Sequence, residues 1–175
     1  MINKPIRKFT FEAILDEYGE GIKRFILSYV KDASATDDLV QDVFLKVYLK
    51  MDTFEDRSAL KTWIYRIAIN RCKDYFRSWH YQKVKLTQKL DLFNLKSGET
   101  PEEFLLQKSE DLSLAREILS LNSKYREVIL LYYYRDFSIS EISELLQLKE
   151  STVRTRMQRA RTQLKAKLGG DDLES

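Results

Sequence analysis

The sequence contains few of the residues that interrupt helices, bind metals or form disulfides. Its 175 residues include only five Gly and two Pro, and none of these lies in residues 22–97 or 102–168. Long stretches without Gly or Pro favour helices over strands and turns. With one His and one Cys, an internal disulfide and a cysteine-based zinc cluster are excluded. These absences predict an all-α protein without a metal site.

Several further features are missing. The longest notable apolar run, in residues 128–134, is far too short to span a bilayer, and the N-terminus lacks the apolar core of a signal peptide. A lone Cys72 suits a reducing compartment, so we expect a cytoplasmic protein with no membrane insertion of its own. The sequence has no Gly-rich phosphate loop and no credible nucleophile–base pair, which argues against an enzyme and against a cofactor.

Charge is distributed unevenly, although the formal net charge is only +3. Residues 61–90 carry eight bases against one acid, and residues 151–168 carry six bases and no acid. Residues 31–60 carry seven acids against four bases, and residues 91–123 carry seven against three. Two basic segments separated by acidic ones predict two nucleic-acid contacts and at least one further partner.

Apolar spacing predicts a helical bundle in residues 10–80. A set of residues in this block recurs every three or four positions, as expected for the buried stripe of a helix. The set is Leu39, Val40, Val43, Phe44, Val47, Tyr48 and Met51. Ser34 is a candidate cap for that helix. A second helix is expected from about Ser58, with Trp63, Ile64, Ile67, Ala68 and Tyr75 facing the core.

A second helical block follows after a break in periodicity. Residues 83–111 contain Gly98 and Pro101 among many charges and predict a flexible linker, with a helix start near Pro101. In the second block we expect helices near residues 112–121, 124–135, 139–147 and 151–168. Gly169 and Gly170 would end the last of them. The predicted fold is therefore two small helical domains joined by a linker.

The C-terminal block has the pattern of a helix-turn-helix. Ser138 and Glu141 form a capping box, and Ile142, Leu145 and Leu146 give the short helix after it an apolar face. A turn at residues 147–149 leads into a longer basic helix. Gln147 stands where many such turns carry Gly, so we expect a strained or different turn there. In such an arrangement the second helix enters the major groove of DNA.

The basic helix divides into inward and outward positions. Val153, Met157 and Ala160 face inward, which leaves a polar and basic face outside. Arg presents a planar fork of donors that matches the acceptors of guanine. The predicted DNA contacts are Ser151, Thr152, Arg154, Thr155, Arg156, Gln158, Arg159 and Arg161, with Arg156, Arg161, Lys165 and Lys167 placed for phosphates. The alternative is a solvated basic face, but the capped short helix and the inward stripe favour DNA binding.

The N-terminal block carries two further surfaces. Arg66, Asn70, Lys73 and Arg77 recur at helical spacing and share one exposed face. Neighbouring rings, on which bases could stack, are Tyr65, Phe76, Trp79 and Tyr81, although most of them could instead lie in the core. A separate stripe holds Asp38, Asp42, Leu45 and Leu49, with Gln41 adjoining. Exposed Leu among acids indicates a protein-docking surface.

Three stretches of the sequence carry a family resemblance. They are "DASATDDLVQDVFLKVY" (residues 32–48), "FEDRSALKTWIYRIAINRCKDYFR" (54–77) and "LNSKYREVILLYYYRDFSISEISELLQLKESTVRTRMQRARTQL" (121–164). In order and spacing they resemble the sigma factors of bacterial RNA polymerase, of the compact extracytoplasmic-function (ECF) group. The resemblance implies a region 2-like domain (1–82), a linker (83–111), a region 4-like domain (112–170) and a tail (171–175).

The resemblance also implies roles for individual residues. The N-terminal domain would bind core RNA polymerase through Asp37, Asp38, Gln41, Asp42, Leu45 and Leu49. It would open and hold the −10 promoter element through Phe54, Arg57, Ser58, Arg66, Asn70, Lys73 and Arg77. The C-terminal domain would recognise the −35 element, with Arg154, Thr155, Gln158 and Arg159 facing base edges. Such a protein directs transcription initiation, often of a stress or envelope-response regulon, and is regulated by an anti-sigma factor.

The main alternative is a stand-alone helix-turn-helix repressor or activator whose N-terminal block dimerises or senses a ligand. Such a regulator has no need of a second basic face beside an acidic docking stripe, and it would bind paired half-sites as a dimer. An all-helical interaction scaffold would explain neither Arg154 nor Arg66 at outward positions.

Overall fold

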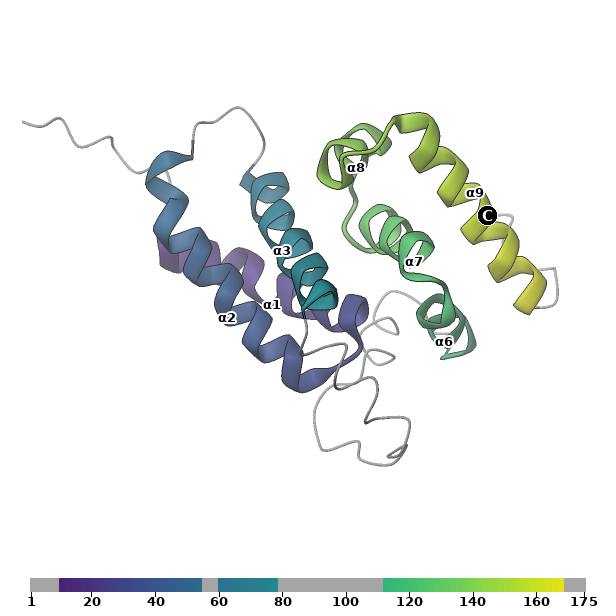
Figure 1. The fold of residues 1–175 in the computed structure, drawn as a ribbon, viewed down its shortest axis with the longest axis horizontal. Coiled ribbons are helices and arrows are strands. Elements are labelled where there is room, and N and C mark those ends of the chain that lie inside the picture. The colour runs from purple at the N-terminus through teal and green to yellow at the C-terminus, as the bar shows by residue number, and fades with distance from the viewer. Residues whose placement is uncertain (1–9, 55–59, 79–111, 169–175) are drawn as a thin grey trace, which may run out of the picture.

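Two helical bundles make up the computed structural model, which describes residues 10–54, 60–78 and 112–168. The first bundle contains α1 (Phe11–Val30), α2 (Ala33–Lys50) and α3 (Leu60–Arg77). The second contains α6 (Leu112–Ser120), α7 (Ser123–Ile129), α8 (Ile139–Leu146) and α9 (Glu150–Leu168) (Figure 1). No strand occurs within these ranges. The predicted all-α fold with two domains is therefore confirmed, while the linker and the tail lie outside the described residues.

The helices of the first bundle begin and end at identifiable caps. The Thr10 side chain accepts a hydrogen bond from the Ala13 N–H at 3.2 Å and caps the start of α1. After Val30, the C-cap residue Lys31 takes the left-handed conformation (φ 59°). Asp32 follows directly and caps α2, since its carboxylate accepts from the Ala35 N–H at 2.9 Å. The prediction of Ser34 as this cap was wrong, because α2 already begins at Ala33 and Ser34 lies in its first turn.

The first core contains most of the predicted stripe. Leu39, Val43, Phe44 and Val47 are buried. Val40 and Met51 are partly buried and pack against the same core. Tyr48 is 51% exposed, because it lies at the rim and packs its ring edge-on against Phe11, with centroids 5.3 Å apart. Two predicted α3 positions, Ile64 and Ala68, are fully buried, and Trp63, Ile67 and Tyr75 pack partly buried against the same core.

The helix-turn-helix is built as predicted. The Glu141 N–H donates to Ser138 Oγ at 3.2 Å and the Ser138 N–H donates to Glu141 Oε2 at 2.8 Å, which completes the capping box. Gln147 ends α8 in the left-handed conformation (φ 57°), and the Leu148 N–H donates back to the Ser143 carbonyl at 3.0 Å. The inward residues of α9 are buried; they are Val153, Met157, Ala160 and Leu164.

One predicted helix changes type partway. The sequence predicts a single helix near residues 124–135, but α7 ends at Ile129 and a turn of π-helix follows over Leu130–Tyr134. Such wider turns are rare and commonly occur at functional positions of helices. After this turn Asp136 takes a left-handed conformation (φ 55°) and the Phe137 N–H donates to the Leu131 carbonyl at 3.1 Å. Phe137 is consequently directed into the core, where it is 2% exposed.

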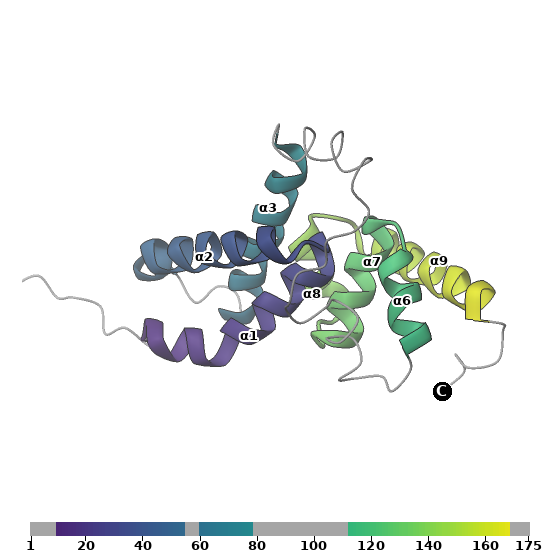
Figure 2. The ribbon, with the colours of Figure 1, turned by 90° about the horizontal axis from the view of Figure 1, so that it is seen from below.

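The two bundles pack against each other through α1, α3, α7 and α8 (Figures 1 and 2). Their buried apolar residues form one continuous cluster. The Tyr65 and Phe137 rings meet edge-to-face across the boundary at 5.1 Å, and the Tyr29 hydroxyl donates to Glu127 Oε2 at 2.8 Å. The sequence does not predict this arrangement, because helical periodicity identifies an apolar face without identifying what covers it.

Arg126 ties the bundles together from within the boundary. Its guanidinium donates to the carbonyls of Leu119 and Leu121 at 2.9 Å each and to the Tyr29 carbonyl at 3.0 Å. The side chain is almost completely buried, with the residue 5% exposed. A cation near the C-terminal ends of two helices complements both helix dipoles and satisfies carbonyls that lack helical partners.

Candidate nucleic-acid interface and docking surface

The outer face of α9 is polar, basic and open to solvent. Five of the predicted outward residues are exposed: Arg154, Thr155, Gln158, Arg159 and Arg161. Ser151 is also exposed, whereas Thr152 is half-buried. Because Val153 and Met157 anchor the helix in the core, its outward side chains have a fixed direction. A helix held in this way can present donors to base edges, which requires a defined orientation on the duplex.

Arg156 differs from the prediction. Instead of facing outward toward a phosphate, it lies half-buried and its Nη1 is 2.7 Å from Glu127 Oε1. The reason is the nearly buried Glu127 carboxylate, which needs a charged partner once it is removed from water. Burial raises the pKa of the Glu127 carboxyl, and its hydrogen bonds from Tyr29 and Arg156 offset part of that rise.

The basic face of α3 is only partly open. Asn70 and Arg77 are exposed, while Arg66 and Lys73 are half-buried on the side that faces the second bundle. Arg66 Nη2 lies 3.9 Å from Glu144 Oε2 of α8. Of the neighbouring rings, Tyr65 is 3% exposed and belongs to the core, which was one of the two alternatives that the sequence left open.

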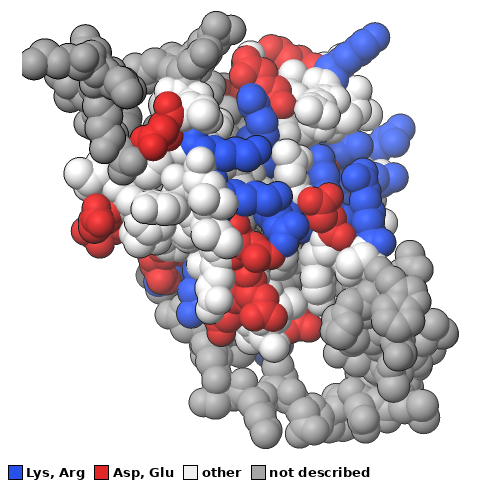
Figure 3. Space-filling model, turned by 60° about the vertical axis from the view of Figure 1, so that its left-hand side comes forward, with Lys and Arg blue, Asp and Glu red and all other residues white. Residues whose placement is uncertain are grey.

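The remaining residues predicted at this face are mostly outside the described part of the chain. Arg57, Ser58, Trp79 and Tyr81 fall in this category. Phe54 is described; it is half-buried, and its ring packs against Trp63 with centroids 5.1 Å apart. Figure 3 shows Lys and Arg side chains in two groups on one side of the molecule, with acidic side chains between and around them.

The predicted docking stripe on α2 is exposed. Leu45 is 56% exposed and Leu49 is 67% exposed, and the neighbouring Asp37, Asp38 and Gln41 are exposed as well. Sequence reasoning missed Tyr48, which it assigned to the core and which adds an exposed ring beside Leu45. Its spacing of three residues from Leu45 places both on one helix surface and could have indicated this position. Large exposed apolar side chains surrounded by acids are typical of protein-binding surfaces.

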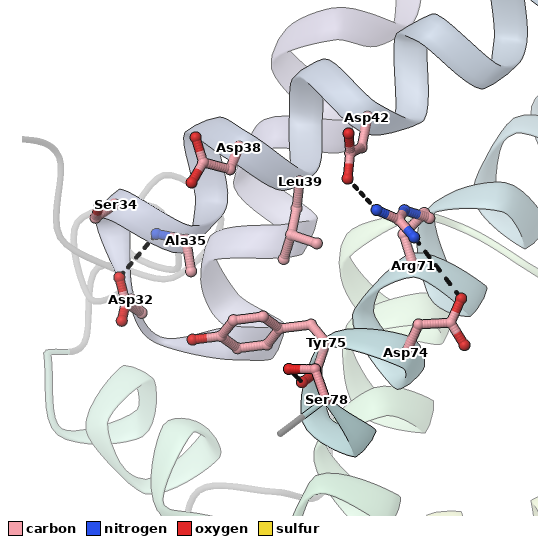
Figure 4. A pocket seen from close by; sticks show the side chains of 10 residues that line it. All are labelled: Asp32, Ser34, Ala35, Asp38, Leu39, Asp42, Arg71, Asp74, Tyr75 and Ser78. Atoms are coloured by element: carbon pink, nitrogen blue, oxygen red, sulfur yellow. Dashed lines mark hydrogen bonds and ion pairs between the residues drawn. The ribbon is translucent and has the colours of Figure 1, made fainter. Parts of the chain in front are cut away.

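A hollow lies beside this stripe, between α2 and α3 (Figure 4). It has a volume of about 620 Å³, and its lining contains Leu39, Tyr75, Arg71 and four aspartates, Asp32, Asp38, Asp42 and Asp74. Asp42 and Asp74 both pair with the Arg71 guanidinium, the latter at 3.9 Å. The predicted docking residue Asp42 is thus also a structural ion-pair partner. The hollow continues the negative charge of the stripe.

Two observations concern other kinds of site. Within the ranges that the structure describes, no group of three or more His, Cys, Asp and Glu side chains is arranged to hold a metal ion. No helix in these ranges is both long and apolar enough to cross a membrane.

Each of the two bundles matches a known family model. The family model "Sigma-70 region 2" matches residues 14–80, and "Sigma-70, region 4" matches residues 111–164. Among solved structures, the sigma factor RpoE of Bartonella quintana, in complex with the anti-sigma factor NepR, has the same fold. The two structures superpose with a TM-score of 0.69 and share 23% sequence identity. The similarity covers 93% of this chain and 98% of the RpoE chain.

Curated proteins are similar over nearly the whole length. The ECF RNA polymerase sigma factor SigW of Bacillus subtilis (strain 168) is 29% identical over 96% of this chain and 97% of its own. The RNA polymerase sigma factor SigZ of the same organism is 31% identical over 91% of this chain and 87% of its own. The chain therefore belongs to the sigma-70 family of RNA polymerase sigma factors, in the extracytoplasmic-function group.

Proposed function

We propose that this chain is a promoter-specificity subunit that binds core RNA polymerase in the cytoplasm and directs transcription initiation without catalysis of its own. Residues 1–82 serve polymerase binding and the −10 element, residues 112–170 serve the −35 element, and residues 83–111 link them. The single observation that carries the proposal is the exposed row Arg154, Thr155, Gln158 and Arg159 on a helix anchored within a helix-turn-helix.

The α2 stripe binds the polymerase in this proposal. Leu45, Tyr48 and Leu49 form an apolar centre, with Asp38 and Gln41 at its rim. Apolar residues at the centre of an interface contribute most of the binding free energy, while charges at the rim guide association and orientation. The acidic rim favours a basic surface on the polymerase.

The α3 face holds the −10 element after strand opening. Arg66, Asn70, Lys73 and Arg77 provide hydrogen-bond donors along one face, which suits the backbone of a single strand. Phe54, together with Arg57 and Ser58, precedes α3 and contributes contacts to an unstacked base.

The α9 face recognises the −35 element in the major groove. Arg154 and Arg159 donate to guanine acceptors, and Ser151, Thr152, Thr155 and Gln158 add polar contacts. A bidentate Arg–guanine contact discriminates against the wrong base by about 1–3 kcal/mol. The Cζ atom of Arg161 lies 5.6 Å from the centroid of the Tyr133 ring, and the guanidinium suits a phosphate contact.

An anti-sigma factor regulates this activity in our proposal, and the genes under its control belong to a stress or envelope response. The anti-sigma partner is supported by the similarity in fold to the sigma factor RpoE, solved with the anti-sigma factor NepR, and to CnrH, solved with the cytosolic domain of CnrY.

The proposal is tested by in vitro transcription from fragmented genomic DNA with purified core polymerase, in the presence and absence of this protein. We expect discrete new start sites that depend on the protein and share sequence elements upstream. If no start sites appear and the protein alone binds specific DNA as a dimer, a stand-alone helix-turn-helix regulator is the better description.

A further inference from the structure

The first turn of α9 holds the only acid of that helix. Between Glu150 and Leu168 the helix carries six Lys and Arg residues, and Glu150 is its single Asp or Glu. The Val153 N–H donates to the Lys149 carbonyl at 3.1 Å, which places Glu150 at the start of the helix. In a helix-turn-helix, the N-terminal residues of the second helix contact base edges. Glu150 therefore lies where bases are read, although its charge repels the phosphates around them.

Glu150 is paired with a residue that is proposed to recognise a base. Glu150 Oε2 accepts a hydrogen bond from Arg154 Nη2 at 3.4 Å, one helical turn further along. Both side chains are open to solvent, Glu150 at 46% and Arg154 at 66%. The pair uses one guanidinium N–H and leaves enough donors for the O6 and N7 acceptors of a guanine. Among the described residues no donor contacts Glu150 Oε1, so this oxygen is available to a ligand.

Cytosine is the base that offers a partner to such an oxygen. Its N4 amino group donates into the major groove, and Glu or Asp is the side chain that accepts from it. Stacked base pairs lie about 3.4 Å apart along the duplex, a spacing that the ends of two paired side chains can cover. Arg154 and Glu150 can thus contact a guanine and a neighbouring cytosine together, each with the chemistry that suits its base.

We propose that Glu150 is a specificity-determining residue of the −35 contact: its carboxylate accepts from the N4 amino group of a cytosine next to the guanine that Arg154 recognises. The inference rests on the proposed function, because it takes α9 as the helix in the major groove. It adds to that function a base for which Arg and Gln have no matching acceptor pattern. The ion pair also limits the directions that the Arg154 guanidinium can take.

Two structural roles of Glu150 require neither DNA nor a cytosine. An acid in the first turn of a helix interacts favourably with the helix dipole, and an exposed ion pair one turn apart adds modestly to helix stability. Both roles would appear in the stability of the chain and would be the same for every promoter sequence. A change in base preference at one position therefore separates base recognition from either of them.

The experiment measures transcription by the complex of this chain with core polymerase. The template is a promoter found in the genomic transcription assay, randomised across its −35 region. Glu150→Ala removes the charge and the acceptor, whereas Glu150→Gln removes the charge and supplies the amide that pairs with adenine N6 and N7. The control is Glu12→Gln at an exposed position of α1, which removes one acid from the other bundle. Thermal unfolding of each variant reports the structural roles.

We expect the parent protein to favour cytosine at one position by roughly fivefold or more, since a base-specific contact contributes at least about this much. Glu150→Ala should abolish that preference and Glu150→Gln should move it to adenine, while Glu12→Gln leaves it unchanged. The position should adjoin the one at which Arg154→Ala relaxes the base preference.

Unchanged base preference in both Glu150 variants would overturn the inference. This holds even if they transcribe more strongly from every promoter, because Glu150 would then act through its charge alone. A parent protein without a cytosine preference beside the Arg154 position would overturn it as well. Failure of the proposed function is a different result, since the parent protein then yields no protein-dependent start sites from which to build the library.

Discussion

The two bundles differ in what they expose on their outermost helices. On α2 of the first bundle, Leu45, Tyr48 and Leu49 lie in water among acids, whereas the outer face of α9 in the second bundle carries Arg, Thr and Gln. Both helices have a buried stripe of similar construction. The inward residues therefore determine the fold, and the outward residues distinguish a protein-binding helix from a DNA-binding helix.

The largest effect on stability is expected from a substitution at the boundary between the two bundles. Arg126→Ala should lower the free energy of unfolding by about 3 kcal/mol or more, because it leaves three buried carbonyls without their charged donor. Thermal unfolding followed by circular dichroism measures this loss. If the bundles were independent, only the second would lose stability and two transitions would separate. Arg116→Ala, at an exposed position of α6, is the control and should change stability by less than about 0.5 kcal/mol.

The next effect tests the docking role of the first bundle. Leu45→Asp combined with Leu49→Asp should weaken binding to core polymerase at least about thirtyfold, since loss of a central apolar contact typically costs about 2 kcal/mol or more. Stability should hardly change, because both side chains are exposed. The leucine Leu15 on α1, which is 36% exposed, provides the control Leu15→Asp. Unchanged binding by the double variant would remove α2 as the docking helix.

Asp42→Arg is a less specific test of the same surface. It would place two guanidinium groups side by side at the position where Asp42 now pairs with Arg71. Any loss of polymerase binding would then combine docking with a disturbed α2–α3 contact.

A third effect separates base recognition from phosphate binding on α9. Arg154→Ala should weaken binding to the preferred promoter by about 1–3 kcal/mol and lower transcription from it accordingly. The variant should also lose the preference for one base at one position of the −35 element. Lys165→Ala should weaken all promoters to a similar, smaller extent and lower the salt dependence. Measured transcription on a promoter library decides between the two patterns. A uniform loss from Arg154→Ala would assign that residue to phosphate contact.

The smallest effect concerns the turn that positions α9. Gln147 has φ 57°, a conformation that costs a non-Gly residue roughly 1 kcal/mol relative to glycine. Gln147→Gly should therefore raise stability by about 0.5–1 kcal/mol and the midpoint of thermal unfolding by a few degrees. A decrease would mean that the Gln147 side chain makes contacts that outweigh the backbone strain.

The sequence predicted what depends on local spacing. Helical periodicity identified the inward residues of α9, and the Ser138–Glu141 pair identified the start of α8, since both depend only on neighbours along the chain. Tyr48 was assigned to the core and is exposed, and the position of Tyr65 stayed open, because an aromatic ring suits core and surface alike. The orientation of Arg156 depends on Glu127, which is 29 residues away in sequence, and no spacing rule relates the two.

The position of the only thiol bears on how this protein responds to its surroundings. Cys72 is completely buried, and burial raises the pKa of its thiol to about 12. Peroxides and disulfides react with exposed thiolates, and Cys72 provides neither exposure nor the thiolate form. The chain should therefore keep its activity under oxidants that inactivate cysteine-dependent proteins. Thiol-based sensing of oxidative conditions would then reside in another molecule.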